Sequence, residues 1–212
     1  ITKMETIKAI VAAPRKSAIG PDLIHNVFLK SLQEKHVESL LTLFNLSWEN
    51  STIPSSWKMS NLIPILKHGK DKTKPASYRP ISLLSCLCKI MERIIQNRLG
   101  WFLETNNHLS PDQYGYRAGR STLDPLIALE SDIQGCLRNR KFLMVVFLDV
   151  EGAFDGASHS VILTKLAALG VHGRLLRWIR CFLSERTFRV SIGSPLSHPH
   201  KVKSGVPQGS IP

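Results

Sequence analysis

Cysteine is scarce in this chain, and its spacing does not suit the common structural zinc sites. The 212 residues include four cysteines, which form one Cys-x-Cys pair and two isolated positions: Cys86, Cys88, Cys136 and Cys181. Zinc fingers and zinc ribbons need paired Cys-x-x-Cys or closely spaced Cys and His ligands, and the sequence has no such pair. We therefore expect the cysteines to be small buried hydrophobic residues in a reducing compartment.

Long apolar runs are also missing. No stretch approaches the roughly 18 uninterrupted apolar residues of a transmembrane helix, and the N-terminal ITKMETIKAI lacks the apolar centre of a signal peptide. With 43% hydrophobic and 21% charged residues, the chain can nevertheless bury a substantial core. The sequence thus predicts a soluble, globular, intracellular protein.

Acidic residues are few relative to basic ones. The chain has 28 Lys and Arg against 16 Asp and Glu, which gives a net charge of +12 and a pI near 9.8. A charge of this size attracts polyanions through counterion release, so nucleic acid is the natural partner. Ribosomal, histone-like and membrane-surface proteins carry similar charge, and composition alone leaves these classes open.

Hydrophobic spacing predicts helices that alternate with a few short strands. Helical spacing occurs in two segments within 22–50 that divide near 34–36, at 90–102, at 122–137, from Ser158 to Gly170 and in the arginine-bearing segment that follows. Strand patterns occur at 61–66 and in a hairpin of TFRVSIGS with HKVKSGV. Between them, residues 67–77 predict a mobile, Lys-rich loop. The pattern is typical of one α+β unit.

The most distinctive run is FLMVVFLDVEGAFD at 142–155. Seven uncharged apolar residues precede Asp149, and a second carboxylate, Asp155, follows six positions later. Such a run is typical of a strand buried on both faces, which would place Asp149 at the end of the strand. A carboxylate there can bind a metal ion. In many α/β proteins it only caps the next helix, and these residues alone leave both possibilities open.

Four motifs occur together and in order: SYRPISLL at 77–84, DQYGYRAGRST at 112–122, FLDVEGAFD at 147–155 and SGVPQGS at 204–210. In this combination nearly the whole chain resembles the reverse transcriptases of non-LTR retrotransposons of the jockey or I-element type. The resemblance implies a right-hand polymerase fold of the α+β class. It also implies that 1–140 form an N-terminal extension and the fingers, and that 141–212 form part of the palm with interleaved helices, as a single reverse transcriptase unit.

The resemblance assigns the catalytic, metal-binding role to Asp149. Nucleotide polymerisation uses two divalent ions held about 3.5 to 4 Å apart by carboxylates, and Mg²⁺ or Mn²⁺ is the implied cofactor. In the related enzymes the first Asp of this motif is a metal ligand. This implies Asp149 as a ligand, with the carbonyl of Val150 as a second contact. Asp155 is expected to brace the turn instead.

Five positions are implied to contact the incoming nucleotide. Arg79 matches the fingers arginine that meets the triphosphate, and the nearby cations Lys67 and Lys70 could assist it. Phe154 matches the aromatic position that packs under the sugar and excludes a 2'-hydroxyl, and Gln208 matches a palm glutamine that contacts the nucleotide. The alternatives are a solvated Lys loop and a core phenylalanine.

Two groups of arginines are candidates for nucleic-acid contact. Arg117 and Arg120 match the template-side segment of the family. Arg174, Arg177 and Arg180 recur every three residues and therefore share one helix face. That face is either a track along a phosphate backbone or a solvated surface, and the sequence leaves both open.

The chain departs from the family pattern in three ways. Gly152 stands where the family usually has Lys, and Ala157 where it has a larger apolar residue, and both changes could loosen the turn after Asp149. No two Asp residues are adjacent, so the Tyr-x-Asp-Asp motif that supplies the remaining metal ligands is missing. We therefore expect a fragment that is inactive by itself and ends before the catalytic centre is complete.

The predicted function is RNA-directed DNA polymerisation, with template RNA, a DNA primer and deoxynucleoside triphosphates as partners. The predicted setting is a retroelement ribonucleoprotein of the cytoplasm and nucleus. The alternative is a non-catalytic RNA-binding remnant of a decayed retroelement. Intron-encoded and telomerase-type reverse transcriptases share the two-metal chemistry, but SYRPISLL and AGRST favour the retroelement.

Overall fold

The computed structural model describes residues 1–193 and 195–211, which form two compact units. Unit 1 combines Ile1–Arg98 with Gly152–Ile211, and unit 2 is Leu99–Glu151. Unit 1 therefore combines segments that are far apart in the sequence. It contains the motifs at 77–84 and 204–210 and the end of the motif at 147–155.

The boundary between the two units falls within one long helix, α5 (Cys86–Thr105), whose first thirteen residues belong to unit 1. This helix confirms the one predicted at 90–102. The predicted division into fingers at 1–140 and palm at 141–212 follows a different line through the chain and stays a prediction.

Unit 1 contains a four-stranded mixed sheet in the order β2-β1-β3-β4. Its strands are β1 (Met59–Leu66), β2 (Tyr78–Leu83), β3 (Thr187–Val190) and β4 (His200–Lys201). β1 pairs antiparallel with β2, with Leu62 opposite Ser82, and parallel with β3, with Ser60 opposite Phe188. The strand predicted at 61–66 and the antiparallel C-terminal hairpin are confirmed.

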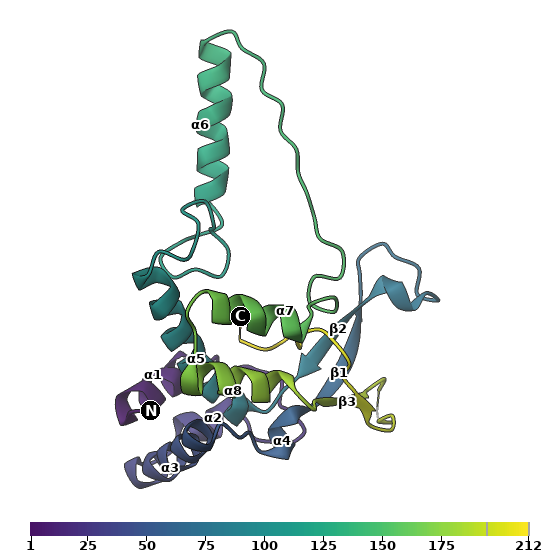
Figure 1. Cartoon of the computed structure of the whole chain (residues 1–212). Helices are drawn as coiled ribbons and strands as arrows, with labels where there is room; N and C mark the ends of the chain where they lie inside the picture. Colours follow the sequence, from purple (N-terminus) through teal and green to yellow (C-terminus); the bar gives the residue numbers. More distant parts are fainter. Residues whose placement is uncertain (194, 212) are drawn as a thin grey trace. The chain divides into compact units, whose positions relative to one another are not determined.

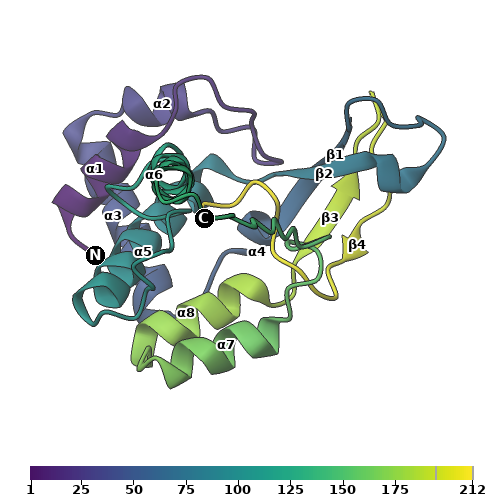
Figure 2. The same cartoon turned by 90° about the horizontal axis from the view of Figure 1, so that it is seen from above.

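The helices of unit 1 gather beside this sheet in both views (Figure 1, Figure 2). They are α1 (Lys3–Ala12), α2 (Asn26–Lys30), α3 (Glu34–Asn50), α4 (Ser55–Lys58), the first part of α5, α7 (His159–Ala168) and α8 (Gly173–Leu183), with a 3₁₀ turn, η1 (Pro75–Ser77), before β2. α7 and α8 lie side by side. In the described part of the chain, no helix combines the length and apolar character needed to cross a membrane.

The core of unit 1 forms where the apolar faces of α3, α5 and α8 meet. Trp178 on α8 stacks on Phe182 with ring centroids 5.6 Å apart, and its indole Nε1 donates a hydrogen bond of 3.1 Å to the hydroxyl of Ser47 on α3. On α5, buried side chains recur at helical spacing, including Ile90 and Ile94. Because these elements come from both ends of the chain, their burial joins residues 1–98 to residues 152–211.

Unit 2 contains the end of α5, a connecting loop and helix α6 (Asp124–Arg138), which confirms the helix predicted at 122–137. α6 begins with Asp124 and Pro125 in its first turn, both favourable at a helix N-terminus. After Arg140, Figure 1 draws the chain as an extended trace without a strand.

The prediction of a buried strand over 142–149 is wrong for this structure. Residues 141–150 form no helix or strand, and the side chains of Phe142, Met144 and Leu148 are almost fully exposed. A strand buried on both faces needs neighbouring strands for its backbone hydrogen bonds and apolar layers over its side chains. No strand in the described residues pairs with this segment, so its apolar composition alone does not produce a strand.

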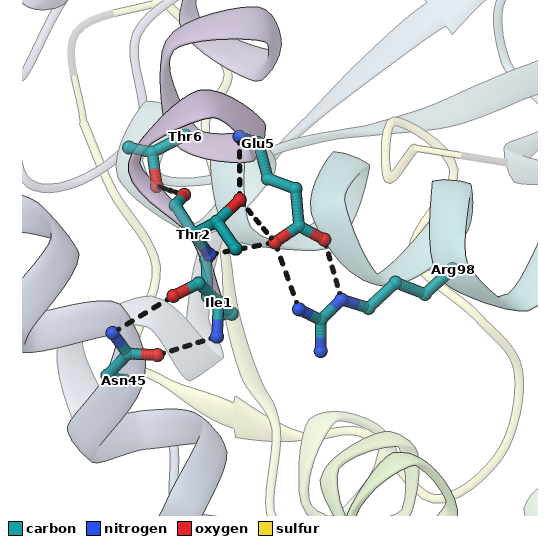
Figure 3. A network of polar contacts seen from close by, with 6 residues as sticks. All are labelled: Ile1, Thr2, Glu5, Thr6, Asn45 and Arg98. Carbon is teal, nitrogen blue, oxygen red and sulfur yellow. Dashed lines mark hydrogen bonds and ion pairs between the residues drawn. The ribbon is translucent and has the colours of Figure 1, made fainter.

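The N-terminal helix is attached to α5 by an ion pair that also takes part in its cap (Figure 3). Thr2 and Glu5 form a capping box, in which the Thr2 hydroxyl accepts from the Glu5 backbone N–H and the Glu5 carboxylate accepts from the Thr2 backbone N–H. Arg98 donates two hydrogen bonds to the same carboxylate, of 2.8 and 3.0 Å. These bonds lower the pKa of Glu5 to about 2.

We expect Glu5→Gln to destabilise the protein near neutral pH and to have no effect in strong acid. Because the folded pKa lies below the ordinary value of 4.5, the ion pair stabilises the fold fully above about pH 4.5 and is lost as pH falls toward 2. The pair is about one-third exposed, so solvent screening limits the loss at pH 7 to about 1 kcal/mol.

Glutamine keeps a side-chain oxygen that can accept the capping-box hydrogen bond, so the substitution measures the effect of the charge. Urea unfolding of both proteins at pH 7 and at about pH 1.5, below the folded pKa of Glu5, measures the difference, and Arg98→Lys tests the two-bond geometry. A stability difference of equal size at both pH values would contradict this account.

Candidate functional site

The segment 204–211 is bonded to the turn that follows the apolar run. The backbone N–H of Val206 donates to the carbonyl of Phe154 at 2.9 Å, and that of Gly205 donates to the carbonyl of Ala157 at 2.8 Å. His159, in the first turn of α7, donates from Nε2 to the Gly205 carbonyl at 2.6 Å. The turn of one motif and the glycine-rich segment of another are thus one structural unit.

Glycine is required where these two segments meet. Gly205 has a φ of +85°, which side-chain-bearing residues rarely adopt. A Cβ on this residue would lie 2.8 Å from the Phe154 carbonyl oxygen and 2.9 Å from that of Asp155. The glycine therefore allows the 204–211 segment to approach the backbone of the turn closely.

The same segment is bonded to the sheet on its other side. The backbone N–H of Ser82 on β2 donates to the carbonyl of Gln208 at 2.8 Å. Gly209 follows with a φ of +138°, and a Cβ there would collide with the Ser82 carbonyl. Gln208 is therefore fixed through its backbone between β2 and the turn, and the residue lines the space between them.

That space is a cavity of about 190 Å³ within unit 1. Its lining includes Pro80, Ser82, Asp155, Arg186, Phe188 and Gln208. An apolar wall with a few convergent polar groups is typical of ligand sites, although this volume is below the roughly 300 to 1,000 Å³ of a complete small-molecule pocket. The cavity has room for one end of a nucleotide.

Arg186 supplies a buried positive charge at the cavity wall, and sequence reasoning missed it. The residue is 2% exposed, its guanidinium donates to the carbonyls of Phe182 and Trp57 at 3.0 and 3.4 Å, and it lies 4.6 Å from the centroid of the Phe182 ring. Burial lowers the pKa of Arg186, and the neighbouring Cys88 and Glu92 oppose that shift. No signal marked this residue, because a lone arginine after a helix has the pattern of a surface residue.

The turn that holds Phe154 and Asp155 is bonded to the segment that holds Gln208, and a common site for Phe154 and Gln208 stays a prediction. Phe154 is 37% exposed, which does not fit the alternative of a core phenylalanine. Asp155, expected to brace the turn, accepts from the Ser204 hydroxyl through its backbone carbonyl and also lines the cavity with Gln208.

Asp149 and Val150 are exposed and lie in unit 2, whereas Phe154 and Gln208 lie in unit 1. The predicted common cleft therefore stays a prediction. Within the described residues, no group of three or more His, Cys, Asp or Glu side chains is placed to hold a metal ion. Asp149 offers one carboxylate and Val150 one carbonyl oxygen, whereas two divalent ions about 3.5 to 4 Å apart need further carboxylates to hold both of them. The described residues therefore do not fit a complete two-metal site.

The fingers cations occupy the β1–β2 hairpin. Arg79 is exposed on β2 and alternates with Pro80 and Ser82, which places it on the face of the sheet opposite the cavity lining. Lys67 donates from Nζ to the carbonyl of Ala76 at 2.9 Å, so its ammonium group supports the hairpin loop. Lys70, in the same loop, is exposed.

The template-side arginines differ in how their guanidinium groups are used. Arg117 makes two hydrogen bonds of 2.7 and 2.9 Å to the carboxylate of Glu104 and a third of 2.6 Å to the carbonyl of Ser110. Arg117 thereby lowers the pKa of Glu104. Arg120 is exposed, with its guanidinium carbon 5.5 Å from the centroid of the Tyr114 ring. A template contact by Arg117 would compete with this ion pair, whereas Arg120 is accessible.

Arg174, Arg177 and Arg180 are all exposed on α8, whereas Trp178 and Phe182 of the same helix are buried. Their shared face is confirmed. A phosphate track and a solvated surface both fit this arrangement, so the nucleic-acid role stays a prediction.

Comparison with known proteins supplies the family. Residues 65–212 match the family described as "Reverse transcriptase (RNA-dependent DNA polymerase)". The "Probable RNA-directed DNA polymerase from transposon BS" of Drosophila melanogaster is 33% identical over 207 residues, which cover 98% of this chain and 23% of the relative. The "RNA-directed DNA polymerase from mobile element jockey" of the same organism is 34% identical over 209 residues, with the same coverage of both chains.

A more distant relationship points the same way. The Pol polyprotein from type-1 retrotransposable element R2 of Popillia japonica is 35% identical over 159 residues, which cover 74% of this chain and 22% of the relative. The chain thus spans less than a quarter of the length of each of these three relatives. The matched family extends from β1 through the segment that holds Gln208, and the chain belongs to the reverse transcriptase family, as a relative of the polymerases of jockey-type non-LTR retrotransposons.

Proposed function

We propose that this chain forms the fingers and part of the palm of an RNA-directed DNA polymerase of a non-LTR retroelement, with a right-hand polymerase fold. The complete enzyme transfers nucleotides from deoxynucleoside triphosphates to a primer 3'-hydroxyl. The observation that supports this proposal is the hydrogen-bonded junction of the 154–157 turn with the 204–211 segment. It bonds the turn that holds Phe154 to the segment that holds Gln208, and Asp155 and Gln208 both line the cavity.

In this proposal the incoming deoxynucleotide lies against Phe154 and Gln208. A planar ring beneath the sugar leaves no space for a 2'-hydroxyl, and the amide of Gln208 can donate to and accept from the nucleotide. Arg79, Lys67 and Lys70 contribute positive charge toward the triphosphate from the hairpin. To do so, Lys67 must exchange its bond to Ala76 for one to phosphate. Because Arg79 lies on the sheet face opposite the cavity lining, its side chain must reach the phosphates around β2, which is an edge strand.

Asp149 is proposed as one carboxylate ligand of the divalent ion, Mg²⁺ or Mn²⁺, with the carbonyl of Val150 beside it. Such an ion, when bound, activates the primer hydroxyl and stabilises the leaving group. Since the described residues do not form a complete metal site, no catalytic step is assigned to this chain by itself.

Template RNA and the DNA primer are proposed to contact Arg117, Arg120 and the α8 residues Arg174, Arg177 and Arg180. Arg117 must release its ion pair with Glu104 to do so. A retroelement ribonucleoprotein of the cytoplasm and nucleus is the proposed setting. A second candidate function, RNA binding without catalysis, is supported by the net charge of +12 together with the lack of adjacent Asp residues.

We expect this chain to bind RNA in a salt-dependent way and to fail in primer extension. Each contact with single-stranded RNA adds roughly 0.7 to the slope of log affinity against log salt. Synthesis should fail because Asp149 cannot hold two ions by itself. Filter binding across a salt series and primer extension measure the two properties.

The comparison is a chimera that continues after Pro212 with the corresponding region of the jockey polymerase. Template-dependent synthesis by the 212-residue chain would show that the metal argument is wrong. Inactivity of the chimera with intact RNA binding would favour the non-catalytic function.

The role of Phe154 is tested by Phe154→Val in the same chimera. Removing the ring should admit ribonucleotides and lower the discrimination against them by about 10-fold or more, while deoxynucleotide incorporation changes little. Single-nucleotide kcat/KM values for matched ribo- and deoxynucleotides measure this. Phe188→Val, which removes a ring from the cavity lining, is the control. If Phe154→Val discriminates against ribonucleotides as strongly as the unmodified chimera, Phe154 does not contact the sugar.

The role of Arg79 is tested by Arg79→Ala. We expect the KM for deoxynucleotides to rise by about 10-fold with little change in RNA affinity, because a guanidinium binds phosphate through two hydrogen bonds. Arg79→Lys should recover only part of the loss. Lys72→Ala removes the same charge from the same hairpin and should leave KM near its normal value. Equal effects of Arg79→Ala and Lys72→Ala would show that Arg79 contributes only general positive charge and no specific contact with the triphosphate.

A further inference from the structure

Glu92 is a buried carboxylate in the middle of α5, with 5% of its surface exposed. Glutamate is almost never buried to this extent unless it is paired. Its Oε2 accepts two hydrogen bonds, from the Ser210 hydroxyl at 2.6 Å and from the backbone N–H of Ile211 at 2.9 Å. Its Oε1 has no hydrogen-bond partner among the residues that the structure describes. The hydrogen bonds found for this carboxylate thus all come from the segment that carries Gln208.

The cost of burying the carboxylate is offset from the cavity side. Arg186 is buried nearby, and Glu92 raises the pKa of this arginine against the effect of desolvation. Arg186 thus contributes a positive charge to the cavity wall, and the negative charge of Glu92 lies near it behind the wall. Glu92 itself is not among the residues that line the cavity.

Packing alone does not account for a carboxylate at this position. Its neighbours on α5, Met91, Ile94 and Ile95, are all buried apolar residues. An apolar side chain of similar volume in such a place is often neutral or stabilising relative to a buried charge. What leucine could not provide is an acceptor for the hydroxyl of Ser210 and the N–H of Ile211.

We propose that Glu92 is a positioning residue for Gln208. This inference rests on the proposed function, in which Gln208 contacts the incoming nucleotide. The segment is fixed at Gln208 by the N–H of Ser82 and beyond Gly209 by Glu92. The backbone is thus fixed on both sides of Gln208, which is one of the residues that line the cavity. Glu92 acts only through this segment and touches neither substrate nor metal.

The central test is Glu92→Leu in the chimera that carries the jockey continuation, compared with Glu92→Gln. Leucine keeps the volume and removes the acceptors, so the KM for deoxynucleotides should rise about 10-fold with a smaller change in kcat and unchanged RNA affinity. Glutamine keeps an acceptor oxygen and should restore KM to within about 3-fold of normal. Ser210→Ala removes one of the two bonds and should fall between them.

A mutant cycle separates positioning from general stability. If Glu92 acts through Gln208, Glu92→Leu should cause no further rise in KM when Gln208 is already alanine. Ser47→Ala is the control, because it removes the hydroxyl that bonds Thr52 and Trp178 in the core of the same unit. It should lower stability without changing KM. An equal rise of KM in both Gln208 backgrounds, or none in either, would overturn the proposal.

Hydrogen exchange on the 212-residue chain gives a readout that needs no activity. Glu92→Leu should accelerate exchange at the amides of Ile211 and Ser82 by about 10-fold, and Ser47→Ala should not. If the unmodified chimera is inactive while exchange responds as expected, the proposed function has failed and the anchoring by Glu92 stands. If the chimera is active and exchange at Ser82 is unchanged, the positioning proposal has failed and the function stands.

Discussion

The candidate site depends on a backbone junction between two segments far apart in the sequence. The N–H groups of Gly205 and Val206 donate to carbonyls of the turn at Ala157 and Phe154. Without those bonds, a turn whose side chains are largely exposed would have no fixed relation to β2 or to Gln208. The junction requires glycine at 205, because a Cβ would lie 2.8 Å from the Phe154 carbonyl oxygen. A specific backbone geometry, rather than apolar burial, therefore forms this edge of the cavity.

Two buried charged residues near that junction support the cavity wall, and their burial costs stability. Arg186 and Glu92 are each at most 5% exposed. Arg186 donates hydrogen bonds to backbone carbonyls, and Glu92 accepts from the Ser210 hydroxyl and the Ile211 backbone N–H. Such groups are expensive to desolvate, and removing one leaves the other uncompensated. Cys88 lies near both, and burial raises the pKa of its thiol well above the ordinary value, so it remains protonated beside the carboxylate. Buried charged and polar groups therefore support a cavity wall whose surface is partly apolar.

The hydrophobic pattern predicted helices and hairpins well, because these elements form their backbone hydrogen bonds within one short segment. The helical spacing of Ile90 and Ile94 gave α5, and Gly170, with a φ of +86°, ends α7 as expected. The apolar run that ends at Asp149 was misread, since a strand exists only with partner strands and composition does not specify them. For the site, motif order indicated Phe154 and Gln208. Glu92 could have been found from its helical spacing to the buried Cys88, whereas Arg186 had no such signal.

The net charge of +12 overstates how many cations are available to a phosphate backbone. Arg98 and Arg117 are each bonded to a carboxylate, and Arg186 is buried with its guanidinium bonded to carbonyl groups. Counterions are released on RNA binding only from cations that exchange water and salt for phosphate. The exposed groups of the 67–74 loop and of the α8 face at 174–180 meet that condition. The salt dependence of binding should therefore reflect these exposed groups, and substitutions of the internally bonded arginines should change stability before they change affinity.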